Sequence, residues 1–359
     1  MANNQIAYGF MGLTEMFAER VTAVNMGLVT RAIEESQTEY NRQLSAIMAT
    51  LASRVTLAQE KVEIPGSGTL QPLDEYGNPK PVPPLGNYTC GYPIQGGGTA
   101  WGTNRVTQAL LTVGEANRAT VDAQGKDLDW MRRHSLAAML AAANWTFADA
   151  EAGNLTVVPL ANGDTVTYPR VGGGVPAVDT HQLAQAAAIS DTDPFFPTLY
   201  SELAEHPSNS GPYAAYIPTN LVSSVMGLTS FVTAPEIAIQ PAVTQDQIVG
   251  NLAEVQRMGS RVLGYVKGYG YAIEWPALPD NYGIGIALGA EAPLAQREYA
   301  AAELQGLFSE SHSPDGNRLE NRFIRYCGFG GRNRVAAAVF RIGNGTYAVP
   351  TGFTPPLSA

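Results

Sequence analysis

The sequence has few cysteines and no long apolar run, and each shortage excludes a class of protein. Two cysteines in 359 residues, Cys90 and Cys327, cannot supply a disulfide framework or a zinc-finger pattern, so we expect two buried, reduced thiols. No stretch reaches the roughly 18 apolar residues that a membrane span requires. The first ten residues lack the basic and apolar regions of a signal peptide, which predicts a soluble, intracellular protein.

Charge is also scarce. Charged residues make up 15% of the chain against 45% hydrophobic residues, whereas charged residues are about a quarter of a typical globular domain. Because interface cores are depleted in charge, the shortage suggests that much of the surface contacts other subunits. The net charge of −10 argues against a dedicated nucleic-acid binder, since that affinity comes from Lys and Arg that neutralise phosphates.

Enzyme motifs are missing as well. The sequence contains no P-loop, no dinucleotide-binding glycine pattern, no GxSxG nucleophile turn, and no HExxH or paired Cys/His metal pattern. Four histidines occur singly: His134, His181, His206 and His312. Each is expected to be structural, and carboxylates such as Asp127 and Asp129 are expected on solvated helix faces, where pKa tuning is weak. We therefore predict no catalytic residues, no cofactor and no metal site.

Two long segments predict helices. Residues 12–60 contain no proline and repeat apolar residues near the helical period, so this helix needs a partner for its apolar stripe. Residues 112–149 predict a second helix, and Gly125 inside it is a point where it can bend. Shorter helices are predicted within 179–190 and 245–259.

Other segments predict strands. The pair Asn162-Gly163 predicts the turn of a hairpin over 154–169. Residues 211–225 predict a strand that leads into a helix, and residues 260–289 and 319–349 predict several strands separated by turns.

Residues 64–104 are rich in glycine and proline but also contain aromatic residues, which is unusual for a solvated linker. Tyr88, Cys90 and Tyr92 alternate as in a strand, and "DEYGNPKPVPPLGN" has the composition of a tip between two extended runs. We expect a long hairpin that reaches away from the body and lies on another surface, since a two-stranded hairpin alone is marginally stable.

The segment "RYCGFGGRNRVAAAVFRIGNGTYAVP", residues 325–350, combines five glycines with four arginines. A phosphate-binding loop would place its glycines where a strand leads into a helix. Here Val335, Ala337 and Val339 alternate within an apolar run that favours a buried strand. The glycines therefore predict bulges or close backbone contacts, and the arginines are expected to pair with carboxylates of neighbouring chains.

The order of these segments resembles the major capsid proteins of tailed bacteriophages, which have the Hong-Kong-ninety-seven-like (Johnson) fold. The resemblance is carried by "GNYTCGYPIQGGGTAWG" before the helix "TVGEANRAT", then by "LPDNYGIGIA", "PLAQREY", "LQGLF" and "YCGFGGRNRVAAAVFRIGNGTY". It covers nearly the whole chain.

The resemblance implies an α+β fold with four parts. Residues 1–60 would form an N-terminal helical arm, and residues 61–104 an extended hairpin, the E-loop. Residues 105–170 and 320–359 would form a peripheral domain with a long spine helix and a long β-sheet. Residues 171–319 would form an axial α/β domain, with loops from 190–213 or 291–317 at the centres of the capsomers.

The implied function is structural and not enzymatic. The chain would be a major capsid subunit that self-assembles into pentamers and hexamers of an icosahedral phage head enclosing double-stranded DNA. It would be assembled in the cytoplasm of the host bacterium and found in the virion. Its partners would be other copies of itself, with portal, scaffolding and cement proteins, with non-specific contact to packaged DNA and no membrane. No cleaved N-terminal segment is expected.

The resemblance also implies contacts between subunits. The candidate interface residues are Tyr76, Lys80, Tyr88, Tyr92, Trp101, Arg325, Arg332, Arg334 and Arg341. Some relatives join a hairpin lysine to an asparagine of a neighbour. Lys80 with Asn333 or Asn344 would be such a pair here, in a reaction that also needs a buried carboxylate.

Three alternatives are left open. An encapsulin-like nanocompartment shell would share the fold and enclose an enzyme cargo. An enzyme with a site assembled by the fold within 171–319 would show perturbed carboxylates converging in one deep pocket. A carbohydrate-binding surface protein would show a groove of stacked Tyr and Trp side chains.

Overall fold

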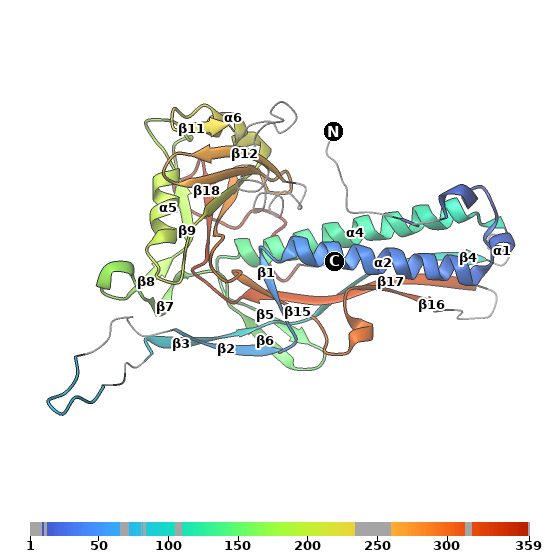
Figure 1. Cartoon of the computed structure of the whole chain (residues 1–359), viewed down its shortest axis with the longest axis horizontal. Helices are drawn as coiled ribbons and strands as arrows, with labels where there is room; N and C mark the ends of the chain where they lie inside the picture. Colours follow the sequence, from blue (N-terminus) through green and yellow to red (C-terminus); the bar gives the residue numbers. More distant parts are fainter. Residues whose placement is uncertain are drawn as a thin grey trace.

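The computed structural model describes residues 9–10, 13–64, 72–79, 81, 84–104, 110–233, 260–312 and 318–357. Within these residues the chain is a mixed α+β structure with two parts side by side and a hairpin that projects below them (Figure 1). None of the helices in the described part combines the length and the apolar character needed to cross a bilayer.

The first part is built on β17 (Arg318–Gly331), which pairs with strands on both of its edges. Among the described residues, five strands form this sheet in the order β1–β15–β17–β16, and β4 also pairs with β17. Their bounds are β1 (Ala52–Val55), β4 (Gln95–Asn104), β15 (Leu294–Arg297) and β16 (Leu307–His312).

Two long helices lie along this sheet (Figure 1). They are α2 (Met26–Met48) and α4 (Val113–Leu140), preceded by the short η1 (Thr14–Met16) and α1 (Val21–Val24). A capping box starts α4: the Glu115 amide donates to the Thr112 hydroxyl, and the Thr112 amide donates to the Glu115 carboxylate. Leu44, Met131 and Phe323, from α2, α4 and β17, lie in one buried core.

Both long helices are shorter than predicted. The helix predicted over 12–60 ends at Met48, because Ala52–Val55 pair in parallel with β15 from a distant part of the chain. The helix predicted over 112–149 ends at Leu140, and β5 (Trp145–Asp149) pairs instead with β6 (Gly153–Val157). In both places, residues 52–55 and 145–149, the residues form strands because a partner strand is available, although their local pattern also suits a helix.

The second part is a mixed sheet of seven described strands in the order β11–β12–β13–β10–β14–β18–β9. Their bounds are β9 (Gln182–Gln185), β10 (Tyr213–Ile217), β11 (Phe231–Thr233), β12 (Arg261–Val266), β13 (Gly270–Glu274), β14 (Tyr282–Ala287) and β18 (Ala337–Ile342). The sheet is accompanied by α5 (Phe196–Ala204), η3 (Thr219–Leu221) and α6 (Val222–Met226). Leu199, Ala215 and Phe340 lie in the core between α5 and the sheet.

Strand pairing joins residues on both sides of position 319, where the expected axial domain (171–319) meets the second segment of the expected peripheral domain (320–359). β15 and β16 pair with β17 in the first sheet, whereas β18 joins the second sheet. The strands predicted within 211–225, 260–289 and 319–349 are confirmed as β10, β12 to β14, β17 and β18. The helix predicted over 245–259 lies outside the described residues.

Two local predictions between residues 154 and 190 are wrong. β6 does not pair with β7 (Asn162–Tyr168), because the chain between them bonds to a distant turn: the Gly331 amide donates to the Val158 carbonyl, and the Ala161 amide to the Arg334 carbonyl. β7 pairs instead with β8 (Ala177–Thr180), just after the 3₁₀ turn η2 (Val171–Gly173). The helix predicted within 179–190 is therefore replaced by β8 and β9.

The glycines of β17 serve close backbone packing, as predicted. A Cβ added at Gly328 would lie 2.2 Å from the Pro93 carbonyl oxygen, and one at Gly331 would lie 2.7 Å from that of Val158. Cys90 and Cys327 are both free and buried, which confirms the prediction of two reduced thiols.

Candidate functional site

The projecting hairpin is the feature that leaves the body of the molecule (Figure 1). Its strands are β2 (Gln59–Ile64) and β3 (Gly86–Gly91), which pair in antiparallel register. At its far end, Asp74 closes a turn by accepting hydrogen bonds from the backbone amides of Tyr76 and Asn78 at 2.9 and 2.7 Å. Tyr76 is 82% exposed, so its own chain leaves this ring uncovered.

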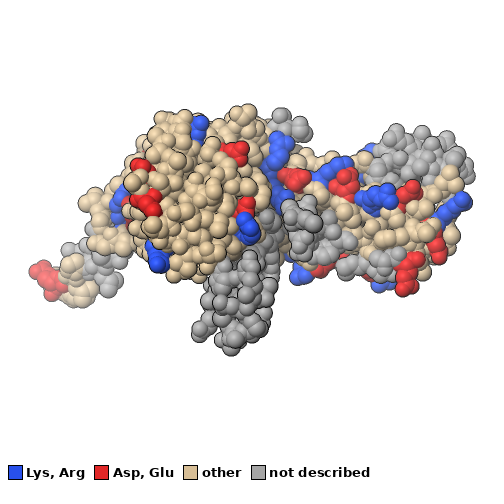
Figure 2. All heavy atoms as spheres, turned by 90° about the horizontal axis from the view of Figure 1, so that it is seen from above, with Lys and Arg blue, Asp and Glu red and all other residues tan. Residues whose placement is uncertain are grey.

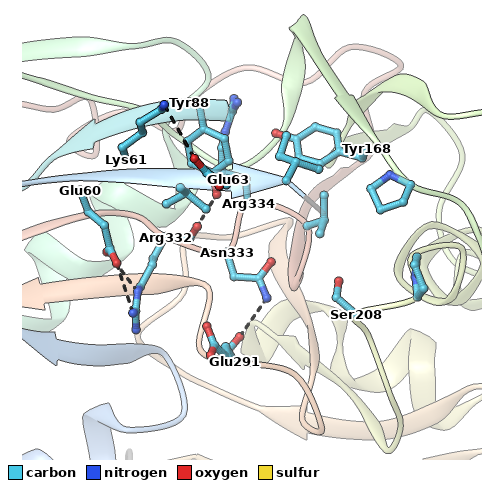
Figure 3. Close-up of a pocket in the computed structure, with 15 residues that line it drawn as sticks. Glu60, Lys61, Glu63, Tyr88, Tyr168, Ser208, Glu291, Arg332, Asn333 and Arg334 are labelled. Atoms are coloured by element: carbon cyan, nitrogen blue, oxygen red, sulfur yellow. Dashed lines mark hydrogen bonds and ion pairs between the residues drawn. The ribbon is translucent and has the colours of Figure 1, made fainter. Parts of the chain in front are cut away.

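Two tyrosines fix the base of the hairpin to the body. Tyr88 lies in β3, and Tyr92 is the residue directly after this strand. Tyr88 and Tyr92 are 9% and 0% exposed and share a buried core with Val157 and Val335. Burial raises the pKa of both phenols. The Tyr88 hydroxyl donates to the Arg332 carbonyl (Figure 3). Both rings, expected at a subunit interface, are thus covered by their own chain.

Two arginines of the turn between β17 and β18 complete this base. The Arg332 Nε donates to Glu60 of β2 at 3.2 Å (Figure 3). The Nη1 of Arg332 donates to the Ser53 hydroxyl at 3.0 Å. The Arg334 guanidinium is fully buried, donates to Asp164 at 2.8 Å, and lies 5.3 Å from the centre of the Tyr88 ring. Their carboxylate partners belong to this chain, so both arginines set how the hairpin leaves the body.

A pocket of about 630 Å³ lies under the hairpin base. Lys61 and Glu63 of β2 lie on one side, with Tyr168 and Asn333 on others (Figure 3). Its described lining contains neither histidine nor cysteine, so it holds no Ser–His or Cys–His pair for nucleophilic catalysis. Its lining combines charged side chains with apolar ones such as Val62 and Ile64.

Arg325 and Arg341 lie elsewhere. Arg325 is buried between α4 and β17, where its Nε donates to Asp127 at 2.6 Å. Asp127 is only 7% exposed, so the expectation that it lies on a solvated helix face is wrong. The Arg341 guanidinium lies 5.5 Å from the centre of the Tyr282 ring. Lys80 and the side chain of Trp101 lie outside the described residues.

The structure brings together two histidines that the sequence separates. His181, after β8, and His206, after α5, face one another with Nε2 atoms 3.0 Å apart, and Asp179 lies beside them. Glu202 and Glu205 complete the cluster. The alternation of Asp179 with His181 and the run from Glu202 to His206 were the available signals, but only the fold shows that they meet.

Comparison with known proteins gives no sequence relative: no family model matches the chain, and no curated protein does. Solved structures do match. A chain from Mycobacterium phage Patience has a TM-score of 0.62 at 18% identity, covering 96% of this chain and 95% of that one. The mature capsid of bacteriophage PhiM1 gives a TM-score of 0.47 at 10% identity, covering 83% and 87%. The holo-SrpI encapsulin complex from Synechococcus elongatus gives 0.43 at 10% identity, covering 82% and 85%.

The first of these likenesses carries the fold assignment, because it extends over almost the full length of both chains. The projecting hairpin, the long helix α4 along β17 and the seven-stranded sheet together form a mixed α+β fold. The chain has the Hong-Kong-ninety-seven-like fold.

Proposed function

We propose that this chain is a shell subunit, the major capsid protein of a phage head that encloses double-stranded DNA. The observation that carries the proposal is a hairpin that extends from a chain of this fold and presents an 82% exposed Tyr76 at its end. An arm of this kind buries its apolar surface only when another subunit covers it.

The distribution of charge supports assembly. On the face shown in Figure 2, the half that carries the seven-stranded sheet has few charged side chains, whereas both signs are interspersed along the α2–α4 half. Surfaces with little charge suit contacts between subunits. The net charge of −10 would limit tight adhesion of packaged DNA to the shell.

The interface residues follow from these positions. Tyr76 and Lys80 at the hairpin end, and Trp101 on β4, are proposed to contact neighbouring subunits in pentamers and hexamers. Arg341, on β18 beside the Tyr282 ring, is also proposed as an interface residue. Portal, scaffolding and cement proteins remain proposed partners, and no catalytic step is part of the role.

Expression of the chain alone tests the proposal, with negative-stain microscopy and sedimentation as readouts. We expect closed shells or ring-shaped capsomers, and nuclease-protected DNA in particles isolated from infected cells. Protected protein cargo without DNA would favour the encapsulin-like alternative. A chain that stays monomeric at high concentration, even with its scaffolding protein, would contradict the shell role.

The hairpin has its own test. Replacing residues 72–79 by a short Gly-Ser linker should stop assembly at free subunits or capsomers. Tyr76→Ser should raise the protein concentration needed for assembly. Leu28→Ser is the control, because this side chain is 50% exposed on α2, in the half with interspersed charges and away from the hairpin. Normal shells from the linker variant would show that the hairpin does not join subunits.

A further inference from the structure

The histidine cluster lies where three elements meet. Asp179 belongs to β8, His181 follows it, and His206 lies just beyond α5. All three side chains are buried, with Asp179 8% exposed and both histidines 0% exposed. The His206 Nε2 lies 3.0 Å from the His181 Nε2 and 3.2 Å from the Asp179 Oδ2.

The hydrogen bonds on the far side of each ring fix the tautomers. The His181 Nδ1 lies 2.8 Å from the Ala337 carbonyl oxygen, and the His206 Nδ1 lies 3.1 Å from that of Pro169. A carbonyl oxygen only accepts hydrogen bonds, so each Nδ1 must carry the proton. In neutral rings both Nε2 atoms are then lone-pair acceptors, and they point at one another and at a carboxylate.

Three buried acceptors that converge need something positive between them. An extra proton on one ring is one solution. Burial opposes it, however, because both rings are 0% exposed and a full positive charge is costly to hold away from water. A metal cation between the two nitrogens is the other solution. Two nitrogens at the usual ~2.0–2.1 Å from a tetrahedral zinc ion lie about 3.3–3.4 Å apart. The Nε2 atoms are 3.0 Å apart, so a small separation of the two rings would admit the ion.

The surrounding carboxylates supply a fourth ligand and the right charge. The Glu205 Oε1 is buried without a hydrogen-bond partner and lies 3.7 Å from the His206 Nε2. Two groups of ligand atoms, each within 4.8 Å of one another, share Asp179: one with His181 and His206, the other with Glu202 and Glu205. Arg170 pairs with Asp179 and Glu205. Three carboxylates and one guanidinium leave two negative charges when ionised, which a divalent cation neutralises.

We propose that Asp179, His181 and His206, with Glu205 as the fourth ligand, form a structural site for a divalent first-row metal ion, with Zn²⁺ the best fit. Two histidines and two carboxylates are ligands that zinc accepts in tetrahedral sites. The carbonyls that hold each Nδ1–H are the outer contacts that usually orient metal-binding imidazoles. The ion would tie the β7–β8 pair to the end of α5 and to β18.

Metal analysis of the full-length chain without an affinity tag tests this directly. The protein is stripped with EDTA, dialysed, and titrated with ZnCl₂ by calorimetry, with bound zinc counted by mass spectrometry. We expect about one zinc ion per chain and a higher thermal unfolding midpoint with zinc. CoCl₂ should give the visible absorption bands of a tetrahedral site. A wild-type chain that binds neither ion stoichiometrically would overturn the proposal, whatever the variants do.

Variants assign the ligands. His206→Gln should lose at least tenfold in zinc affinity, because even changes outside the ligand shell cost about 10–100-fold. His134→Gln is the matched control, since this histidine stacks on Trp130 in α4, away from the cluster. Glu205→Gln replaces the ligand on a partly exposed side chain, so it should disturb folding less. This variant tests the ligand assignment if His206→Gln does not fold. Zinc binding of unchanged affinity in folded His206→Gln or Glu205→Gln protein would refute the assignment.

Discussion

The buried ion pair between Arg325 and Asp127 gives the sharpest stability prediction. The Arg325 Nε and Nη2 donate to the two Asp127 oxygens at 2.6 and 2.8 Å, and the two side chains are 4% and 5% exposed. The Tyr40 hydroxyl donates to the same carboxylate at 2.7 Å. These contacts join α2, α4 and β17 inside the first core.

Asp127→Ala would leave a guanidinium without its two short carboxylate contacts in a site that solvent hardly reaches. Removing one partner of a buried pair costs about 3–5 kcal/mol. The matched control is Asp122→Ala on the same helix. Its pair with Lys126 is exposed on both sides and should contribute about 0–1 kcal/mol.

The assay is guanidinium chloride unfolding of unassembled protein, followed by circular dichroism and by tryptophan fluorescence. Agreement of the two probes shows whether one free energy of unfolding describes the transition. The double change Asp127→Leu with Arg325→Met should recover part of the loss, because the unpaired guanidinium is removed while the buried Tyr40 hydroxyl still lacks its acceptor. The reasoning fails if Asp127→Ala lowers the free energy of unfolding no more than Asp122→Ala does.

Three further predictions follow from local geometry. Gly125→Ala should raise the free energy of unfolding by about 0.5–1 kcal/mol, since nothing lies within 4 Å of the added Cβ in α4; a loss in the same unfolding assay would contradict this. Gly328→Ala should cost about 1–3 kcal/mol, because its Cβ meets a backbone carbonyl, while Gly86→Ala, in open space on β3, should change little. Burial raises the pKa of the Cys90 thiol to about 12 and that of Cys327 well above its usual value, so folded protein at pH 8 should resist a thiol reagent. Both thiols should react after unfolding, and rapid labelling of the folded chain would show that one is accessible.

Much of the secondary structure could be predicted because its signals are local. The alternation of Tyr88, Cys90 and Tyr92 predicted a strand, and the structure places these residues in or next to β3. The glycines of residues 325–350 predicted close backbone contacts, and Gly328 shows one. The end of α4 had no clear signal in the sequence. The helix ends at Leu140, but the alanines that follow suit a helix equally well.

The errors arise where distant segments compete for the same residues. Residues 52–55 become β1 only because β15 is available to pair with them. Residues 158–161 leave the predicted hairpin because their backbone bonds to the turn after β17. Neither partner can be recognised from the local pattern, which contains no information on segments far along the chain.

The sequence by itself determined the low content of charge, the burial of the thiols, the existence of a projecting hairpin and the order of segments that resembles a capsid fold. These properties depend on residue type and short-range periodicity. Only the tertiary structure decided which charges meet. Arg325 and Asp127 are 198 residues apart in the chain, and His181 and His206 are 25 apart. Their pairing depends on how sheets and helices pack, because ionic and metal-binding geometry requires atoms to meet within a few ångströms.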